Sequence, residues 1–266
     1  MRIVRFLSGG ETHFGQQIDN DHALRIEGDL FSGFHVSNQR LRIEKLLAPI
    51  VPTDIFCIGL NYREHAKESG ATPPPNPVLF IKSGNALNHP FDPIILPRRS
   101  QQVDYECELA VVIGRAAKNV SRQQAIEHVF GYTCANDVSA RDWQRQRDLG
   151  GGQWARAKSF DTFCPLGPCL VTRDEIPNPN QLHLKTTLNG QVMQDHTTAD
   201  MIFDVPALIE SLSSTLTLRP GSVILTGTPP GVGFARTPPV FLKPGDHVVM
   251  EIEKIGRLEN PVRSEA

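Results

Sequence analysis

The sequence predicts an α+β fold that is mainly β, with a small strand-rich unit at the N-terminus. Short apolar runs separated by turn residues outnumber segments with helical apolar spacing. The chain has 266 residues, and its 21 prolines and 21 glycines leave little room for long helices. Residues 1–50 alternate short apolar runs with glycine and Asp/Asn turns, and prolines interrupt residues 48–52. We therefore expect a small β-rich domain over residues 1–50 and a main domain over residues 51–266.

The composition excludes several classes of protein. Hydrophobic residues make up 39% and charged residues 21% of the chain, and the net charge is -2, so nothing indicates nucleic-acid binding or attraction to a membrane. No apolar run approaches the roughly 20 residues of a membrane-spanning helix. Residues 1–6 resemble a strand instead of a signal peptide. The five cysteines are an odd set without Cys-x-x-Cys, which predicts reduced, buried thiols and an intracellular, cytoplasmic protein.

The main domain begins with an apolar run at residues 55–60, which predicts a buried strand. A polar helical segment follows over residues 61–69 and stops at Gly70. Three prolines at 73–75 then exclude a helix. A short helix between two such breaks is typical of a mobile lid.

The rest of the main domain alternates short strands and helices. The apolar run of residues 103–113 predicts one long strand. Asn189-Gly190 lies between two alternating runs and predicts a hairpin turn, because this dipeptide tolerates positive φ. The remaining expected segments are a capping-box helix at 121–128, a strand at 130–135, a helix beginning within 138–146, a helix at 206–218 and strands at 223–225 and 247–252.

Three acidic residues form the strongest chemical signal. Glu106 and Glu108 stand two apart in the predicted strand, so their side chains leave one face while Cys107 faces the core. Two like charges this close are unfavourable unless a cation, a proton or solvent relieves them. Asp137 follows one supersecondary unit later, at the end of a predicted strand. Three carboxylates without a Cys or His ligand suit Mg²⁺, with Mn²⁺ as the substitute. The alternative is an edge strand with an exposed acidic face.

The predicted lid helix carries a second signal. His65 and Glu68 are three residues apart and therefore neighbours on one helix face. A carboxylate beside an imidazole raises its pKa and orients it, as a general base requires. The alternative is a solvated polar helix with an incidental pair.

Three further places could contact an anionic substrate. Arg141 and Gln144 share a helix face near the proposed metal, although Arg141 could merely pair with Asp142 or Asp137. Lys158 lies among small and apolar residues, where it could neutralise an enolate or act as a counter-ion for the acidic cluster. The small-residue loop at 226–233 could touch an anion or be only a tight turn, and it lacks the ending of a P-loop.

Taken together, these motifs resemble the fumarylacetoacetate hydrolase superfamily. The matching blocks are residues 58–65, 104–109, 137–144, 158–160 and 225–233, and their order and spacing match over most of the chain. The resemblance implies a mixed, mainly β roll or sandwich, a catalytic domain over residues 51–266, and a homodimer. It also implies a Mg²⁺ or Mn²⁺ ion held by Glu106, Glu108 and Asp137.

The resemblance assigns roles to further residues. It implies that His65, Glu68 and Lys158 are catalytic, and that the substrate contacts are Arg141, Gln144, Thr228 and, as a weaker candidate, Thr162. Members act on 2-oxo acids and β-dicarbonyls, so we expect an enzyme that enolises a small 2-oxo acid. Tautomerisation of oxaloacetate is expected first, and the alternatives are C–C hydrolysis of an acylpyruvate-like substrate and decarboxylation of oxaloacetate. A catalytically inactive metal-binding homologue is the competing class.

Overall fold

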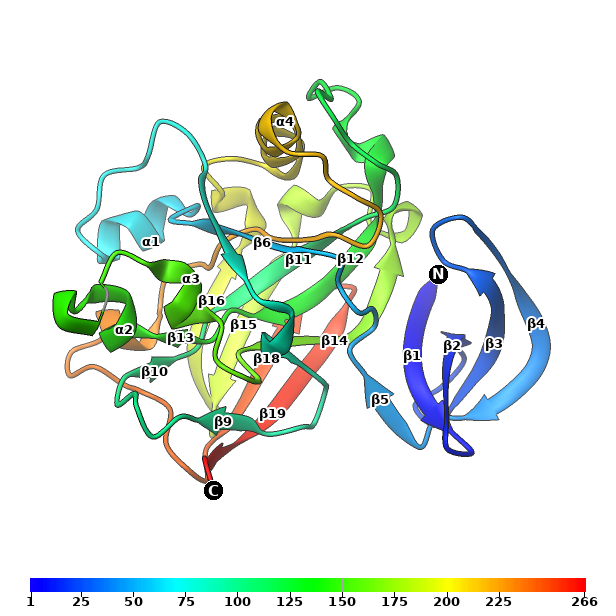
Figure 1. Ribbon diagram of the computed structural model, residues 1–266, viewed down its shortest axis with the longest axis horizontal. Coiled ribbons are helices and arrows are strands. Elements are labelled where there is room, and N and C mark those ends of the chain that lie inside the picture. Colours follow the sequence, from blue (N-terminus) through cyan, green and yellow to red (C-terminus); the bar gives the residue numbers. More distant parts are fainter. Residues whose placement is uncertain (150) are drawn as a thin grey trace.

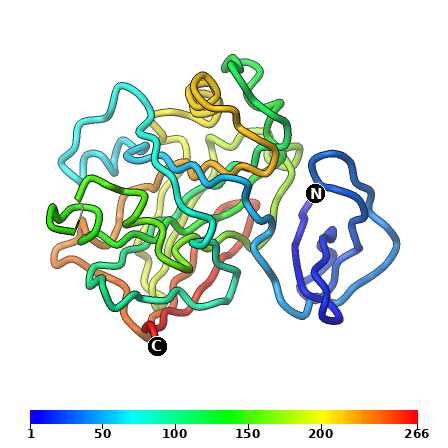
Figure 2. The backbone as a smooth tube through the Cα atoms, in the orientation of Figure 1, coloured from blue at the N-terminus to red at the C-terminus, as the bar shows by residue number. Residues whose placement is uncertain are grey.

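The structure, a computed structural model, describes residues 1–149 and 151–266. Its first five strands lie together at one side of the molecule (Figure 1, Figure 2). They are β1 (Arg2–Ser8), β2 (Glu11–Gln17), β3 (His22–Asp29), β4 (Gly33–Arg42) and β5 (Lys45–Leu47). β1 also pairs antiparallel with a strand of the main body, through Arg2 and Ile3. The N-terminal strands therefore extend the main sheet.

The main sheet combines β1–β5 with seven strands of the main body. These strands are β6 (Ile55–Gly59), β7 (Val78–Lys82), β8 (Leu87–Asn88), β11 (Cys107–Ile113), β12 (Val129–Asn136), β14 (Cys164–Thr172) and β17 (Val223–Leu225). The order is β4-β3-β2-β1-β14-β12-β11-β17-β6-β7, with β5 on β1 and β8 on β14. Every residue of β6 and β11 is buried, as expected for apolar strands covered on both faces.

A second sheet packs against the centre of the first, since its strands contact β11, β12 and β14. Its order is β16-β15-β18-β19-β9, with β9 (Ile94–Leu96), β15 (His183–Leu188), β16 (Gln191–Thr197), β18 (His247–Ile252) and β19 (Gly256–Ser264). The short strands β10 (Val103–Asp104) and β13 (Ser139–Ala140) pair separately. Parallel pairs such as β6–β17 occur beside antiparallel ones, so the predicted mixed, mainly β fold is confirmed.

Short helices connect the strands. They are α1 (Arg63–Glu68), α2 (Arg141–Arg145), α3 (Trp154–Lys158) and α4 (Val205–Thr215). The 3₁₀ segments are η1 (Gly84–Ala86), η2 (Ala125–His128), η3 (Arg147–Leu149), η4 (Arg173–Glu175), η5 (Pro179–Gln181), η6 (Thr198–Asp200) and η7 (Gly233–Ala235). Among the described residues, no helix combines the length and hydrophobicity needed to cross a bilayer.

Several local predictions are confirmed. The hairpin joins β15 and β16, and both Asn189 and Gly190 have positive φ. α4 forms close to the predicted helix, with the Asp204 side chain accepting a hydrogen bond from Ala207 N at 3.0 Å as an N-cap. All five cysteines are buried and free.

Two predictions are wrong in detail. The expected strand over 103–113 is interrupted at Tyr105 and Glu106, because Glu106 N donates to the Asn136 side chain (3.0 Å) instead of to a neighbouring strand. The expected helix over 121–128 is only the 3₁₀ turn η2, and the Ser121 hydroxyl bonds the Gln124 side chain instead of capping a helix.

Candidate active site

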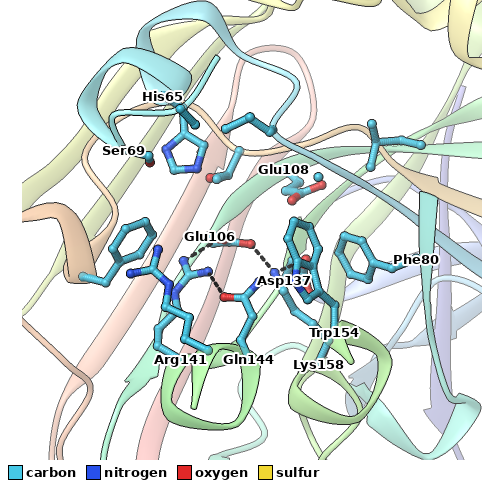
Figure 3. Close-up of a pocket in the computed structure, with 17 residues that line it drawn as sticks. His65, Ser69, Phe80, Glu106, Glu108, Asp137, Arg141, Gln144, Trp154 and Lys158 are labelled. Carbon is cyan, nitrogen blue, oxygen red and sulfur yellow. Dashed lines mark hydrogen bonds and ion pairs between the residues drawn. The ribbon is translucent and has the colours of Figure 1, made fainter. Parts of the chain in front are cut away.

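A cavity of about 240 Å³ opens where the ends of β11 and β12 meet α1, α2 and α3 (Figure 3). Of the residues predicted to act, His65, Glu106, Glu108, Asp137, Arg141, Gln144, Lys158 and Thr228 line it. The other lining residues are Ile58, Gly59, Leu60, Ser69, Ala71, Phe80, Arg145, Trp154 and Phe234.

Strand register brings the three acidic residues together. β11 and β12 are antiparallel, and Cys107 at the start of β11 lies opposite Asn136 at the end of β12. Glu106 and Glu108 stand on either side of Cys107, so both lie next to Asp137, which follows β12 directly. Each residue can offer one carboxylate oxygen, and the three oxygens lie within 4.8 Å of one another. The acidic cluster is therefore buried, which contradicts the alternative of an exposed acidic face.

Buried cations neutralise two of these carboxylates. Lys158 Nζ donates to Glu106 Oε2 and to Asp137 Oδ2, both at 2.6 Å, and Arg141 Nη2 donates to Glu106 Oε1 at 2.5 Å. Burial alone would raise the pKa of Glu106, but the charges of Arg141 and Lys158 outweigh it and hold that pKa below its usual value. Burial likewise opposes the charged form of Lys158, yet Asp137 and Glu106 raise the pKa of Lys158 to about 12.

Glu108 has no such partner. Its Oε2 accepts a hydrogen bond from Gly227 N at 2.7 Å, and no ion pair joins it to any described residue. Burial, followed by the charges of Asp137 and Glu106, raises the pKa of Glu108 well above its usual value. A bound cation would relieve this unpaired buried acid, and an all-oxygen donor set fits a hard divalent ion. The residues therefore fit a metal ion at this position.

Lys82 is a buried counter-ion of the acidic cluster that the sequence analysis missed. Its Nζ donates to Asp137 Oδ1 at 2.5 Å and to the carbonyl of Val138 at 3.1 Å, and its side chain is fully buried. It lies 55 residues before Asp137, so no short motif connects the two. One signal was available in the sequence: Lys82 directly follows the apolar run Val78-Leu79-Phe80-Ile81. A lysine in a buried strand is almost always paired with an acid.

Arg141 also has different partners from those considered. It pairs with Asp104, at 2.9 Å from its Nε, and with Glu106, not with Asp142 or Asp137. Its Nη1 donates to Gln144 Oε1 at 3.0 Å, which leaves the Gln144 amide NH₂ as a donor toward the cavity.

The predicted pair on the short helix forms within α1. His65 Nδ1 lies 2.7 Å from Glu68 Oε1, so Nε2 is the ring nitrogen left for a substrate. His65 is buried, which contradicts the alternative of a solvated helix face. Glu68 also accepts a hydrogen bond from Gly231 N, with Oε2 at 2.9 Å, and this bond attaches the helix to the loop at 226–233.

Backbone amides of the loop at 226–233 donate hydrogen bonds to three carboxylates of the protein. Gly227 N donates to Glu108, Gly231 N to Glu68, and Gly233 N to Asp104 at 2.8 Å. Thr228 Oγ1 accepts a hydrogen bond from Gln194 Nε2 at 2.8 Å and keeps its own proton to donate.

Thr162 does not line the cavity. Its Oγ1 accepts a hydrogen bond from Ile95 N at 2.8 Å, and its backbone has a φ of +68°. The structure therefore brings together every predicted site residue that we named except Thr162 and Glu68, and Glu68 does not line the cavity but bonds His65, which does.

The fold and the cavity define a class of protein: an enzyme with a small cavity whose buried carboxylates could hold a cation. The family model described as fumarylacetoacetate (FAA) hydrolase, C-terminal, matches residues 54–263, and a second model, Rv2993c-like, N-terminal, matches residues 1–49. The chain belongs to the fumarylacetoacetate hydrolase family.

Relatives with known names support this assignment. The chain is 51% identical over 218 residues to the mitochondrial oxaloacetate tautomerase fahd2 of Xenopus laevis, which covers 82% of this chain and 68% of that protein. It is 49% identical over 240 residues to the fumarylacetoacetate hydrolase domain-containing protein 2 homolog of Dictyostelium discoideum, which covers 86% of this chain and 78% of that protein.

Solved structures show the same architecture over the whole chain. The 5-carboxymethyl-2-hydroxymuconate delta-isomerase of Mycobacterium smegmatis matches with a TM-score of 0.86 at 39% identity, covering 100% of both chains. The fumarylacetoacetate hydrolase of Exiguobacterium antarcticum matches with a TM-score of 0.83 at 36% identity, again covering 100% of both.

Proposed function

We propose that this protein is a Mg²⁺- or Mn²⁺-dependent enzyme that interconverts the keto and enol forms of oxaloacetate. The observation that carries the proposal is the buried cluster of Glu106, Glu108 and Asp137 facing His65 across one small cavity. Relatives near 50% identity carry the name oxaloacetate tautomerase, which supports the choice of reaction.

Glu106, Glu108 and Asp137 would hold the ion, which when bound would supply positive charge to polarise the 2-oxo group of the substrate. Four buried carboxylates, including Asp104, face the three buried cations Lys82, Arg141 and Lys158. The protein's own charges therefore nearly balance, and a divalent ion would make the cavity positive enough to attract a dianion.

The protein's own residues would bind the substrate and move the proton. The amide of Gln144 and the hydroxyl of Thr228 are free to donate to substrate oxygens. His65 Nε2 would take a proton from carbon 3 of the keto form and deliver it to the 2-oxygen to give the enol; in the reverse direction it would return the proton to carbon 3. Glu68 keeps that imidazole oriented through Nδ1.

C–C hydrolysis of an acylpyruvate-like substrate is the second candidate. Phe80 and Trp154 pack edge to face at one wall of the cavity, with ring centroids 5.5 Å apart, and an apolar acyl group would fit against them. The His65–Glu68 pair could equally activate a water molecule. Decarboxylation of oxaloacetate would instead break the C3–C4 bond of the keto form and release CO₂, and the resulting enolate of pyruvate would then take a proton at carbon 3.

Two ultraviolet assays separate these reactions. We expect the purified protein with Mg²⁺ to accelerate the decay of the oxaloacetate enol and EDTA to abolish the acceleration, while acetylpyruvate is not cleaved. Faster cleavage of acetylpyruvate than enol decay would establish the hydrolase instead. Inactivity on both substrates with either ion would favour the inactive metal-binding homologue.

We also propose that the protein forms a homodimer and works in a reducing, cytoplasmic compartment. The edge strand β7 exposes Val78, Leu79 and Ile81, which supports an interface there, and the five free cysteines support the compartment. Separate family matches to residues 1–49 and 54–263 support two domains divided near residue 50. Light scattering of the purified protein and of Ile81→Lys tests the dimer, which the substitution is expected to weaken.

A further inference from the structure

Three cationic side chains line the cavity among the described residues: Arg141, Arg145 and Lys158. Arg141 bonds Asp104 and Glu106, and Lys158 bonds Glu106 and Asp137. The guanidinium of Arg145 has no hydrogen bond or ion pair with any described residue. Within the described part of the chain, Arg145 is therefore the only cavity-lining cation that forms no ion pair with a carboxylate.

Phe234 positions Arg145 without neutralising it. The guanidinium carbon of Arg145 lies 3.9 Å from the centre of the Phe234 ring, and that of Arg141 lies 4.4 Å from the same centre. A guanidinium stacked on a ring keeps its charge and its N–H donors in the plane. The two arginines are four residues apart on α2, so they leave the same helix face.

The charges at this end of the cavity favour the binding of an anion. Partial burial and then the charge of Arg141 lower the pKa of Arg145, and the opposing charges of Asp104 and Glu106 do not fully offset them. Two neighbouring cations of which only one is paired attract a carboxylate from solution. Another part of the cavity wall is apolar and is formed by Ile58, Leu60, Phe80 and Trp154.

We propose that Arg145, stacked on Phe234, is the specificity residue that binds the second carboxylate of a 2-oxo dicarboxylic acid. The inference rests on the proposed function and names its substrate class: the enzyme selects acids with a carboxylate at the far end over acids with an alkyl or acyl group there. An alkyl group gains nothing from a guanidinium, whereas a carboxylate accepts two of its N–H bonds.

The test compares two ligands that differ only at the far end. Oxaloacetate carries a carboxylate where 2-oxobutyrate carries a methyl group, and both have the same 2-oxo acid end. Binding of each to the Mg²⁺-loaded protein is measured by calorimetry with fresh ligand, and the ratio of the two dissociation constants reports the preference. Arg145→Met keeps a long apolar side chain on Phe234, and Arg145→Lys keeps the charge without the planar fork.

We expect the wild-type preference for oxaloacetate to fall by about tenfold in Arg145→Met and by less in Arg145→Lys. The matched control is Arg156→Met, since Arg156 is stacked on Trp143 at 4.5 Å in the adjacent helix but does not line the cavity. That variant is expected to keep the wild-type ratio. Thermal unfolding of all three variants checks that each is folded.

Two outcomes would overturn the inference: a wild-type protein without any preference, or the same preference in Arg145→Met as in the wild type. Failure of the proposed reaction gives a different result. If the wild type does not tautomerise oxaloacetate but Arg145→Met still loses its preference in binding, the recognition site stands and the reaction is wrong. If the wild type is active and the preference is unchanged in the variant, the reaction stands and Arg145 is only a stacking residue.

Discussion

Glu108 is the carboxylate of the cavity that no described cation neutralises. Its neighbours Glu106 and Asp137 each accept bonds from two cationic side chains, whereas Glu108 accepts only the amide of Gly227. Burying a charge without a counter-ion is costly, and burying two like charges beside it adds to the cost. The buried cluster therefore lowers the stability of the folded protein, and a bound cation would recover that stability.

Glu108→Gln is expected to weaken Mn²⁺ binding by about tenfold or more, because an amide oxygen replaces a charged ligand. Stability without metal should be unchanged or higher, since the repulsion with Asp137 is removed. Calorimetry with Mn²⁺ measures the first effect and denaturation in EDTA the second. Glu251→Gln on β18, outside the cavity, is the control, and equal Mn²⁺ affinity in both variants would show that Glu108 is not a ligand.

His65→Ala is expected to lower kcat for enol decay by roughly 100-fold or more, since a positioned acid–base group typically contributes at least that factor. Mn²⁺ affinity should be unchanged, because His65 bonds Glu68 and none of the three acidic ligands. His128→Ala, on η2 and away from the cavity, should behave as wild type. Full activity in His65→Ala would remove the imidazole from the reaction.

Lys82→Met is expected to lower the free energy of unfolding in EDTA by about 3 kcal/mol, because it removes one partner of a fully buried ion pair with Asp137. Lys45→Met provides the matched control, since Lys45 forms an exposed pair with Asp92 at 2.7 Å and should cost less than about 1 kcal/mol. Chemical denaturation gives both values. A cost for Lys82→Met no greater than for the control would show that Asp137 does not need this lysine.

At the scale of elements, hydrogen bonds join residues 61–68, which include α1, to the loop at 226–233. Glu68 accepts the amide of Gly231, and the Asn61 side chain bonds the carbonyl of Thr226 at 2.7 Å. The loop therefore sets the position of the helix that carries His65. The sequence predicted the helix and the loop separately, but their contact joins residues more than 160 positions apart.

Gly231→Ala is expected to disturb these contacts. A Cβ at Gly231, where φ is +101°, would lie 2.2 Å from the carbonyl oxygen of Met193, whereas one at Gly70, where φ is +65°, meets no atom within 4 Å. We expect Gly231→Ala to lower the free energy of unfolding by more than about 2 kcal/mol. Gly70→Ala should lower it by about 1 kcal/mol, from backbone strain alone. Denaturation gives the costs, and hydrogen exchange of residues 61–70 reports loosening of α1. Equal costs would show that the loop adjusts freely.

At the scale of the whole molecule, the cavity joins segments from across the main domain. Residues from 58 to 234 line it, so the binding of a cation is coupled to the folding of the main sheet and of the short helices beside it.

Mg²⁺ is therefore expected to stabilise the folded protein by about 2.7 kcal/mol at 100 times its dissociation constant, which raises the unfolding midpoint by several degrees. Calorimetric unfolding in Mg²⁺ and in EDTA measures the shift. Glu108→Gln should show a much smaller shift. A wild-type midpoint that does not respond to Mg²⁺ or Mn²⁺ would contradict a metal site in this cavity.

The sequence by itself determined the features that follow from local geometry. The two-residue spacing predicted that Glu106 and Glu108 share one side, and both line the cavity although Glu106 stands just before β11. The period of a helix made His65 and Glu68 neighbours, and Asn189-Gly190 specified its hairpin. Each depends on residues within a few positions of one another, so backbone geometry alone is sufficient.

Only the tertiary structure decided which charges meet. Three contacts illustrate this, and each joins residues 37 to 67 positions apart. They are the ion pairs Lys82–Asp137 and Asp104–Arg141 and the hydrogen bond from Ile95 N to the Thr162 hydroxyl. Such contacts depend on which strands are neighbours and in what register they pair, and one residue of slip would turn every side chain of a strand to its other face. Local patterns carry no information about that register, so the counter-ions of the cavity could not be read from them.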